Sequence, residues 1–144
     1  MLSAIQIKQH VFIHVEVICD QECLKAPDNE SYEVILSATE PTQETVASPW
    51  KMNVDVRFGS SDDTKPVRYR GHLSVMGFFE VHPGFAEDKR LDLIRMNGGS
   101  LLLGAIREMV LTLTSRSARG PFELPTFDAR MFLKQPESSQ APRN

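Results

Sequence analysis

The residues from Ser100 to Phe132 read SLLLGAIREMVLTLTSRSARGPFELPTFDARMF, and this stretch decides the fold. Its first half predicts an amphipathic helix that has Ser100 as its N-cap and ends before Gly120 and Pro121. The apolar stripe expected to cover the dry face of a sheet consists of Leu102, Ala105, Ile106, Met109 and Leu113. The second half is a short, strongly apolar segment.

Two shorter helical segments are predicted on either side of the long helix. Thr126 is a suitable N-cap for a short helix from Phe127 to about Leu133. Upstream, residues 88–96 carry apolar side chains on one side, enough for one or two helical turns. Residues 97–100, which read NGGS, are expected to break the chain before the long helix begins.

The first eighty residues alternate between apolar and polar side chains, which is the pattern of half-buried strands. Strands are predicted over residues 5–19, 32–38, 50–58 and 67–81. The residues between them have turn or loop chemistry, with Pro, Gly, Asp and Ser prominent. Four antiparallel strands covered by one long helix and followed by a short terminal helix make an α+β fold.

Length and composition are those of one ordinary globular domain. The chain has 144 residues, of which 41% are hydrophobic and 24% charged, enough for one core. We expect the domain to span residues 1–133 and the polar residues 134–144 to form a disordered tail. No apolar run approaches the roughly 18 residues of a membrane span, and the alternating N-terminus is unlike a signal peptide. A cytoplasmic location without membrane insertion is therefore expected.

The charge and the cysteines argue against two classes of function. A net charge of −3 and a pI near 5.8 are unlike a nucleic-acid-binding domain, which needs a concentrated basic face. The basic cluster at residues 65–72 turns Tyr69 inward, so that it lacks a stacking aromatic side chain. Cys19 and Cys23 supply two ligands, whereas a tetrahedral zinc site needs four, and we expect them to be reduced thiols.

The sequence contains no recognisable catalytic motif, such as a nucleophile elbow, a P-loop or a dinucleotide fingerprint. His10 and His14 lie on one strand, where four residues separate them by roughly 13 Å, too far to ligate one metal ion. A cross-strand histidine pair stays open. We expect no enzymatic activity, no cofactor and no metal. A closed pocket ringed by His72, His82 or Asp92 would instead indicate a ligand-binding enzyme.

The chain has more large apolar residues than one dry sheet face needs. Large exposed apolar patches usually mark association or ligand surfaces, and Phe and Met side chains suit partners that vary. An apolar groove that binds polypeptide is therefore predicted from Phe12, Ile18, Met76, Phe78, Phe122, Leu124 and Phe127. The alternative is a larger core together with a homo-oligomer interface.

The C-terminal stretch resembles the SecB family of bacterial protein-export chaperones. The shared landmarks are the apolar run into Arg107-Glu108, the Ser115-Arg116 pair, and the Leu124-Pro125 step that leads to Phe127-Asp128-Ala129. The resemblance implies a dimer of dimers and an ATP-independent holdase that keeps polypeptides unfolded in long apolar grooves for the translocase motor. It also implies that residues 20–31 form a crossover loop beside a groove and that residues 127–133 line it.

The chain departs from the family pattern at two places. Residues 98–100 read Gly-Gly-Ser where the family has Cys-Pro-Asn, and Gly104 stands where it has a second proline. SecB is also strongly acidic, which suits docking to the motor. Two kinds of non-native client stay open, namely export precursors and the antitoxin of a toxin–antitoxin pair. The rival from another class is a small oligomeric structural or adaptor domain that binds no client.

Overall fold

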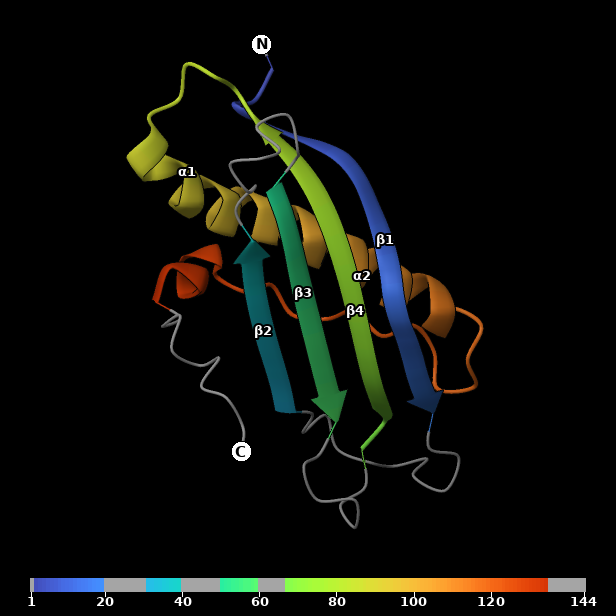
Figure 1. Cartoon of the computed structure of the whole chain (residues 1–144). Coiled ribbons are helices and arrows are strands. Elements are labelled where there is room, and N and C mark those ends of the chain that lie inside the picture. Colours follow the sequence, from blue (N-terminus) through green and yellow to red (C-terminus); the bar gives the residue numbers. More distant parts are fainter. Residues whose placement is uncertain (1, 20–30, 40–49, 60–66, 135–144) are drawn as a thin grey trace, which may run out of the picture.

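The computed structural model describes residues 2–19, 31–39, 50–59 and 67–134. Figure 1 shows four antiparallel strands crossed on one face by a long helical segment. The strands are β1 (Ile5–Cys19), β2 (Ser31–Thr39), β3 (Trp50–Gly59) and β4 (Tyr69–Val81). Their order is β1-β4-β3-β2, so that β1 and β2 are the outermost of these strands. All four predicted strands are confirmed, with boundaries within two residues.

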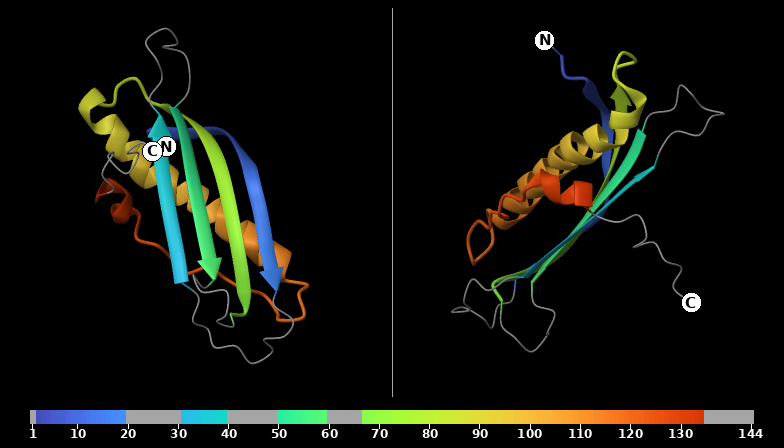
Figure 2. Two further views of the ribbon diagram at one scale, coloured as in Figure 1. Left: turned by 60° about the horizontal axis from the view of Figure 1, so that its bottom comes forward. Right: turned by 90° about the vertical axis from the view of Figure 1, so that its left-hand side faces the viewer.

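The helical segments lie together on one face of the sheet, as the edge-on view in Figure 2 shows. They are α1 (Glu87–Leu93), the π-helical turn η2 (Ile94–Gly98), α2 (Gly99–Thr114) and the 3₁₀ helix η3 (Ala129–Lys134). The predicted α+β fold is confirmed. None of the helices in the described ranges has the length and apolar character needed to cross a bilayer. The tail was predicted over residues 134–144, but Lys134 is the last residue of η3, and residues 135–144 lie outside the described residues, as do the connections 20–30 and 40–49.

The predicted break at residues 97–100 is wrong, because the chain runs through them as helix. Gly98 has right-handed helical dihedral angles, and the hydroxyl of Ser100 donates to the carbonyl of Met96, 2.8 Å away, inside the helix. The glycines serve close packing instead. A Cβ on Gly98 would lie 3.1 Å from Cε of Met52, and one on Gly99 would lie 2.8 Å from the ring of Phe132.

The core lies between the helical layer and the inner face of the sheet. Side chains with no exposed area come from β3, β4 and the helical layer: Met52, Val54, Val56, Leu73, Val75, Phe79, Ile94, Leu102, Ile106 and Val110. The buried stripe of α2 also includes Leu103 and Thr114, whereas Leu113 is 47% exposed. The buried stripe is therefore rotated slightly about the helix axis from the predicted one, because apolar residues occur on most sides of this helix.

Two β-bulges in β1 change which side chains face the core. The pairing with β4 shifts register between Ile7 and Gln9 and again between Phe12 and His14. Each bulge adds an unpaired residue and so inverts the alternation of faces. Phe12 consequently pairs with Val75 and packs against the core. The prediction that Phe12 projects from the opposite face is wrong for this reason.

Candidate polypeptide-binding surface

The predicted groove residues occupy different parts of the molecule. Strand alternation places Met76 and Phe78 on the sheet face away from the helices, which we call the outer face, since Leu73, Val75 and Phe79 are fully buried on the inner face. Both side chains are half-buried. Their predicted outward direction agrees with the structure.

An apolar patch forms around these two residues. Val11 is the cross-strand partner of Met76, and its side chain is 38% exposed. Phe78 lies between Gln9 of β1 and Lys51 of β3. We call Val11, Met76 and Phe78 the outer-face patch. Val11 was not predicted for this surface, because strict alternation assigns it to the inner face and only the bulge at residue 8 turns it outward.

Ile18 is also on the outer face but belongs to another part of it. It pairs with Arg70 near the far end of β1 and is 49% exposed. Seven residues of strand separate it from Val11, a distance of roughly 20 Å. The structure therefore does not bring Ile18 together with the outer-face patch.

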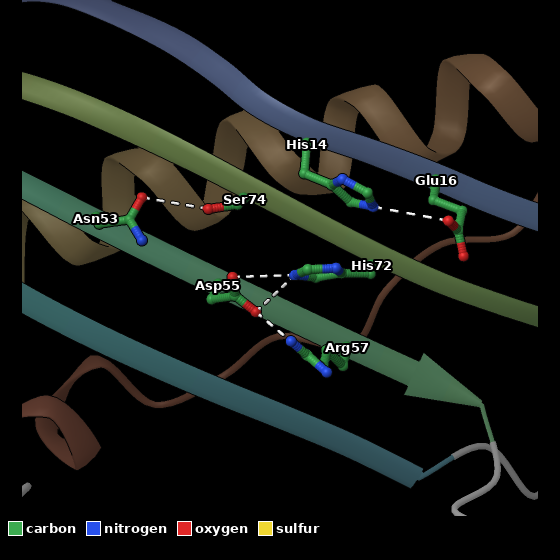
Figure 3. A network of polar contacts seen from close by, with 7 residues as sticks. All are labelled: His14, Glu16, Asn53, Asp55, Arg57, His72 and Ser74. Carbon is green, nitrogen blue, oxygen red and sulfur yellow. Dashed lines mark hydrogen bonds and ion pairs between the residues drawn. The ribbon is translucent and has the colours of Figure 1, made fainter. Parts of the chain in front are cut away.

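Figure 3 shows a polar network on the outer face, which the strand register places between Ile18 and the outer-face patch. Nε2 of His72 on β4 is 2.9 and 3.0 Å from the carboxylate oxygens of Asp55 on β3, which Arg57 also approaches at 3.5 Å. The ring of His14 on β1 stacks on that of His72 with centroids 4.4 Å apart, and Glu16 lies 3.7 Å from Nε2 of His14. The network thus links three adjacent strands.

Among the described residues, this network does not bring together enough ligands to hold a metal ion. The cross-strand histidine pair is present, but within the described ranges no group of three or more His, Cys, Asp or Glu side chains could hold a metal ion. The nearby hydroxyl of Ser74 donates to the side-chain oxygen of Asn53, 3.3 Å away, rather than to a histidine. The arrangement is that of cross-strand polar pairs on an exposed sheet face.

The C-terminal apolar segment is mostly core. Phe122 is 3% exposed, and its ring lies 5.4 Å from that of Phe58 and 5.3 Å from that of Tyr69. Leu124 is 1% exposed. The predicted placement of Phe122 and Leu124 in an exposed groove is wrong, because both side chains are buried in the same core as the sheet.

Phe127 is the member of this segment that stays accessible. It is half-buried, and its ring meets that of Tyr32 on β2 edge-to-face, with centroids 5.9 Å apart and a 72° interplanar angle. Tyr32 is 36% exposed. We call these two residues the β2-edge aromatic pair. The predicted short helix starts later than expected, at Ala129, where Asp128 rather than Thr126 accepts a backbone N–H bond, from Arg130 at 3.0 Å.

Strand β1 carries further exposed apolar side chains. Among the described strands it pairs only with β4, so its other edge is open. Two clefts lie between its inner face and α2. One of about 490 Å³ is lined by Ile7 and Leu101 among others, and one of about 320 Å³ by Val15 and Leu113. Because these four side chains are 39–47% exposed, this β1–α2 trough is an uncovered apolar surface.

A third cleft, of about 500 Å³, lies where β1 begins and β4 ends. Leu2, Val81 and Phe85 give it an apolar lining, to which His82 contributes. Of the three titratable residues named for an enzyme pocket, His82 lines this cleft, whereas His72 and Asp92 do not.

Comparison with known proteins identifies the fold. No protein-family model and no curated protein sequence matches the chain. Among solved structures, the SecB-like chaperone Rv1957 of Mycobacterium tuberculosis matches with a TM-score of 0.59, covering 87% of this chain and 91% of that one at 17% identity. This chain has the SecB-like fold. That structure holds Rv1957 in complex with a ChAD peptide from the HigA1 antitoxin.

The SecB-like fold confirms the layout that the C-terminal resemblance implied, with a long helix across a four-stranded antiparallel sheet. A protein of unknown function from Streptococcus agalactiae is also similar, at 13% identity and a TM-score of 0.46, over 85% of this chain and 97% of that one.

Proposed function

We propose that this protein is an ATP-independent holdase that binds unfolded or non-native polypeptides. The observation that carries the proposal is the accessible apolar area of the outer-face patch and the β2-edge aromatic pair on a SecB-like fold. The outer-face patch and the β2-edge aromatic pair offer large, undirected contacts, which suit clients of varied sequence. The proposal includes no enzymatic activity, no cofactor, no metal and no nucleic-acid partner, and it places the protein in the cytoplasm.

An antitoxin is the first candidate client, because the similar chaperone Rv1957 is seen with an antitoxin peptide. Export precursors are the second. The charge of the outer face favours an antitoxin client, since its acidic residues are balanced by basic ones. The acidic residues are Glu16, Glu33, Asp55 and Glu80, and the basic ones are Lys51, Arg57, Arg70 and Lys8, which pairs with Glu80 at 3.0 Å. This face therefore lacks the acidic excess that suits docking to the translocase motor.

We further propose that the protein acts as a homo-oligomer, a dimer of dimers. An open, apolar edge strand promotes pairing with another chain unless it is covered. Strand β1 is 15 residues long, and Ile13 at its second bulge is 57% exposed. A second copy that covers the β1 edge and the β1–α2 trough would leave the outer-face patch and the β2-edge aromatic pair accessible to a client.

The test is aggregation of a chemically unfolded protein, followed by light scattering, with and without this protein and without ATP. Phe78→Asn in the outer-face patch should reduce protection several-fold. Ile35→Asn is the matched control, because Ile35 is an exposed apolar residue of the same face, 48% exposed and two strands away. Both variants should keep the circular dichroism spectrum and the oligomer size. Equal loss in both variants, or none in Phe78→Asn, would contradict the role of the patch.

The rival function is a structural or adaptor domain whose apolar surface serves only assembly. A dye that fluoresces on accessible apolar surface separates the two, because the assembled holdase should bind it and an adaptor should not. Absence of protection for every client tried, including products of neighbouring genes, would refute the holdase.

A further inference from the structure

The chain between α2 and η3 returns along the helical layer (Figure 1). It is held by side chains from two elements, α2 and β4. At its start, Oγ1 of Thr114 accepts the backbone N–H of Phe122 and donates to the carbonyl of Val110, each at 2.8 Å. The hydroxyl of Tyr69 on β4 donates to the carbonyl of Gly120, 2.5 Å away. These bonds fix the first half of the return.

Arg107 of α2 holds the second half. Its Nε donates to the carbonyl of Leu124 over 3.2 Å, and its Nη2 lies 3.3 Å from Oε1 of Glu123. The side chain of Leu124 is buried, so both the backbone and the side chain of this residue are fixed. The next fully buried anchor is Phe132, which lies against Gly99.

Phe127 lies in the span between these two anchors. It follows Leu124 by three residues, and three residues of chain reach at most about 10 Å, so Phe127 must lie close to the held carbonyl. Its position opposite Tyr32 therefore depends on where the carbonyl of Leu124 is held.

We propose that Arg107 is a positioning residue for polypeptide binding, because it holds Leu124 where Phe127 meets Tyr32. This inference rests on the proposed function and deepens it. A binding surface that is already in its bound shape avoids the cost of ordering a loop when the partner arrives. Arg107 acts through Phe127 and does not itself touch the client.

The experiment is a double-mutant cycle on the affinity for a fluorescently labelled, permanently unfolded protein, measured with the full chain. Arg107→Gln should weaken binding about tenfold, the scale of one lost hydrogen bond to a charged group. Phe127→Ala should weaken it at least as much. The double variant should match Phe127→Ala alone, because Arg107 has no effect once Phe127 is absent. Additive losses would overturn the inference.

Two matched variants keep the test decisive. Glu123→Gln removes the ion pair but leaves the bond from Arg107 to Leu124, so affinity should stay within about twofold. Arg107→Lys retains a donor for that carbonyl and should largely restore binding, whereas a tenfold loss in Arg107→Lys would contradict the clamp. If Arg107→Gln does not fold, Arg107→Lys and Glu123→Gln decide the matter by the same criteria.

Failure of this inference is distinguishable from failure of the proposed function. A wild-type protein that binds no unfolded chain refutes the function itself. A wild-type protein that binds, with an affinity that neither Arg107→Gln nor Phe127→Ala changes, refutes only the positioning role.

Discussion

Two glycines of one helix should respond in opposite ways to the same substitution. Gly99 and Gly104 both lie in α2. A Cβ on Gly99 would lie 2.8 Å from two ring carbons of Phe132 and 3.0 Å from Cδ1 of Leu36. A Cβ on Gly104 would meet nothing within 4 Å. We therefore expect Gly99→Ala to destabilise the protein relative to Gly104→Ala.

The magnitude follows from two terms. Alanine is a better helix former than glycine by about 0.8–1 kcal/mol, and both variants gain this contribution. Gly99→Ala alone also forces atoms into an occupied space, at a cost of roughly 1–3 kcal/mol for an overpacked core. The difference between the two free energies of unfolding should thus be about 1–3 kcal/mol, with Gly104→Ala more stable than the wild type.

Urea unfolding followed by the fluorescence of Trp50, the single tryptophan, measures this difference at one fixed protein concentration. With a slope of roughly 2 kcal/mol per molar urea, the two midpoints should be about 0.5–1.5 M apart. Equal midpoints would refute the close packing of α2 against the sheet and Phe132. Destabilisation by Gly104→Ala would contradict the open space beside Gly104, because it would show that this face of α2 is covered.

Two further substitutions test the packing that the sequence did not reveal. Phe12→Ala should lower the free energy of unfolding by about 1–3 kcal/mol, because Phe12 packs against the core. Ile18→Ala on the exposed outer face should lower it by less than about 1 kcal/mol. The urea midpoints of the two variants measure this difference, and equal midpoints would contradict the bulged register. Thr114→Val should lower the free energy of unfolding by about 1–3 kcal/mol, because it leaves the buried N–H of Phe122 without its acceptor. Thr114→Ser keeps the hydroxyl and should restore most of that loss. An unchanged thermal midpoint in Thr114→Val would contradict the stabilising role of this hydrogen bond.

The strands could be predicted from the sequence because alternation is a local property. Trp50, Met52, Val54, Val56 and Phe58 follow one another at period two, and the structure places all of them on the inner face. The helical layer could also be predicted, since its apolar residues recur at helical spacing. The SecB-like sequence motifs of the C-terminal stretch predicted the layout that the fold comparison confirms.

Features that depend on contacts between distant residues could not be read from the sequence. Nothing in the local pattern marks the bulges at Lys8 and Ile13, which exchange the faces of Phe12 and Val11. The two glycines at 98 and 99 look like a helix break, and their role appears only when Phe132 and Met52 lie against them.

The candidate site could be predicted only where its residues lie on a regular strand. Met76 and Phe78 lie on a regular strand, so alternation placed them correctly. Phe122 and Leu124 lie in irregular chain, where periodicity gives no face, and the hydrogen bonds from Thr114 and Arg107 bring them into the core. Tyr32 was not considered because it alternates inward, and its exposure follows from its position on a strand at the side of the sheet.

The outer-face patch and the β2-edge aromatic pair are proposed to bind polypeptide that is not folded. The most direct test of this proposal is the affinity of the purified protein for one labelled protein in two forms, permanently unfolded and native, measured by fluorescence anisotropy without nucleotide. We expect saturable binding of the unfolded form, weakened several-fold by Phe78→Asn and little changed by Ile35→Asn, with no binding of the native form. Equal binding of both forms, or of neither, would contradict it.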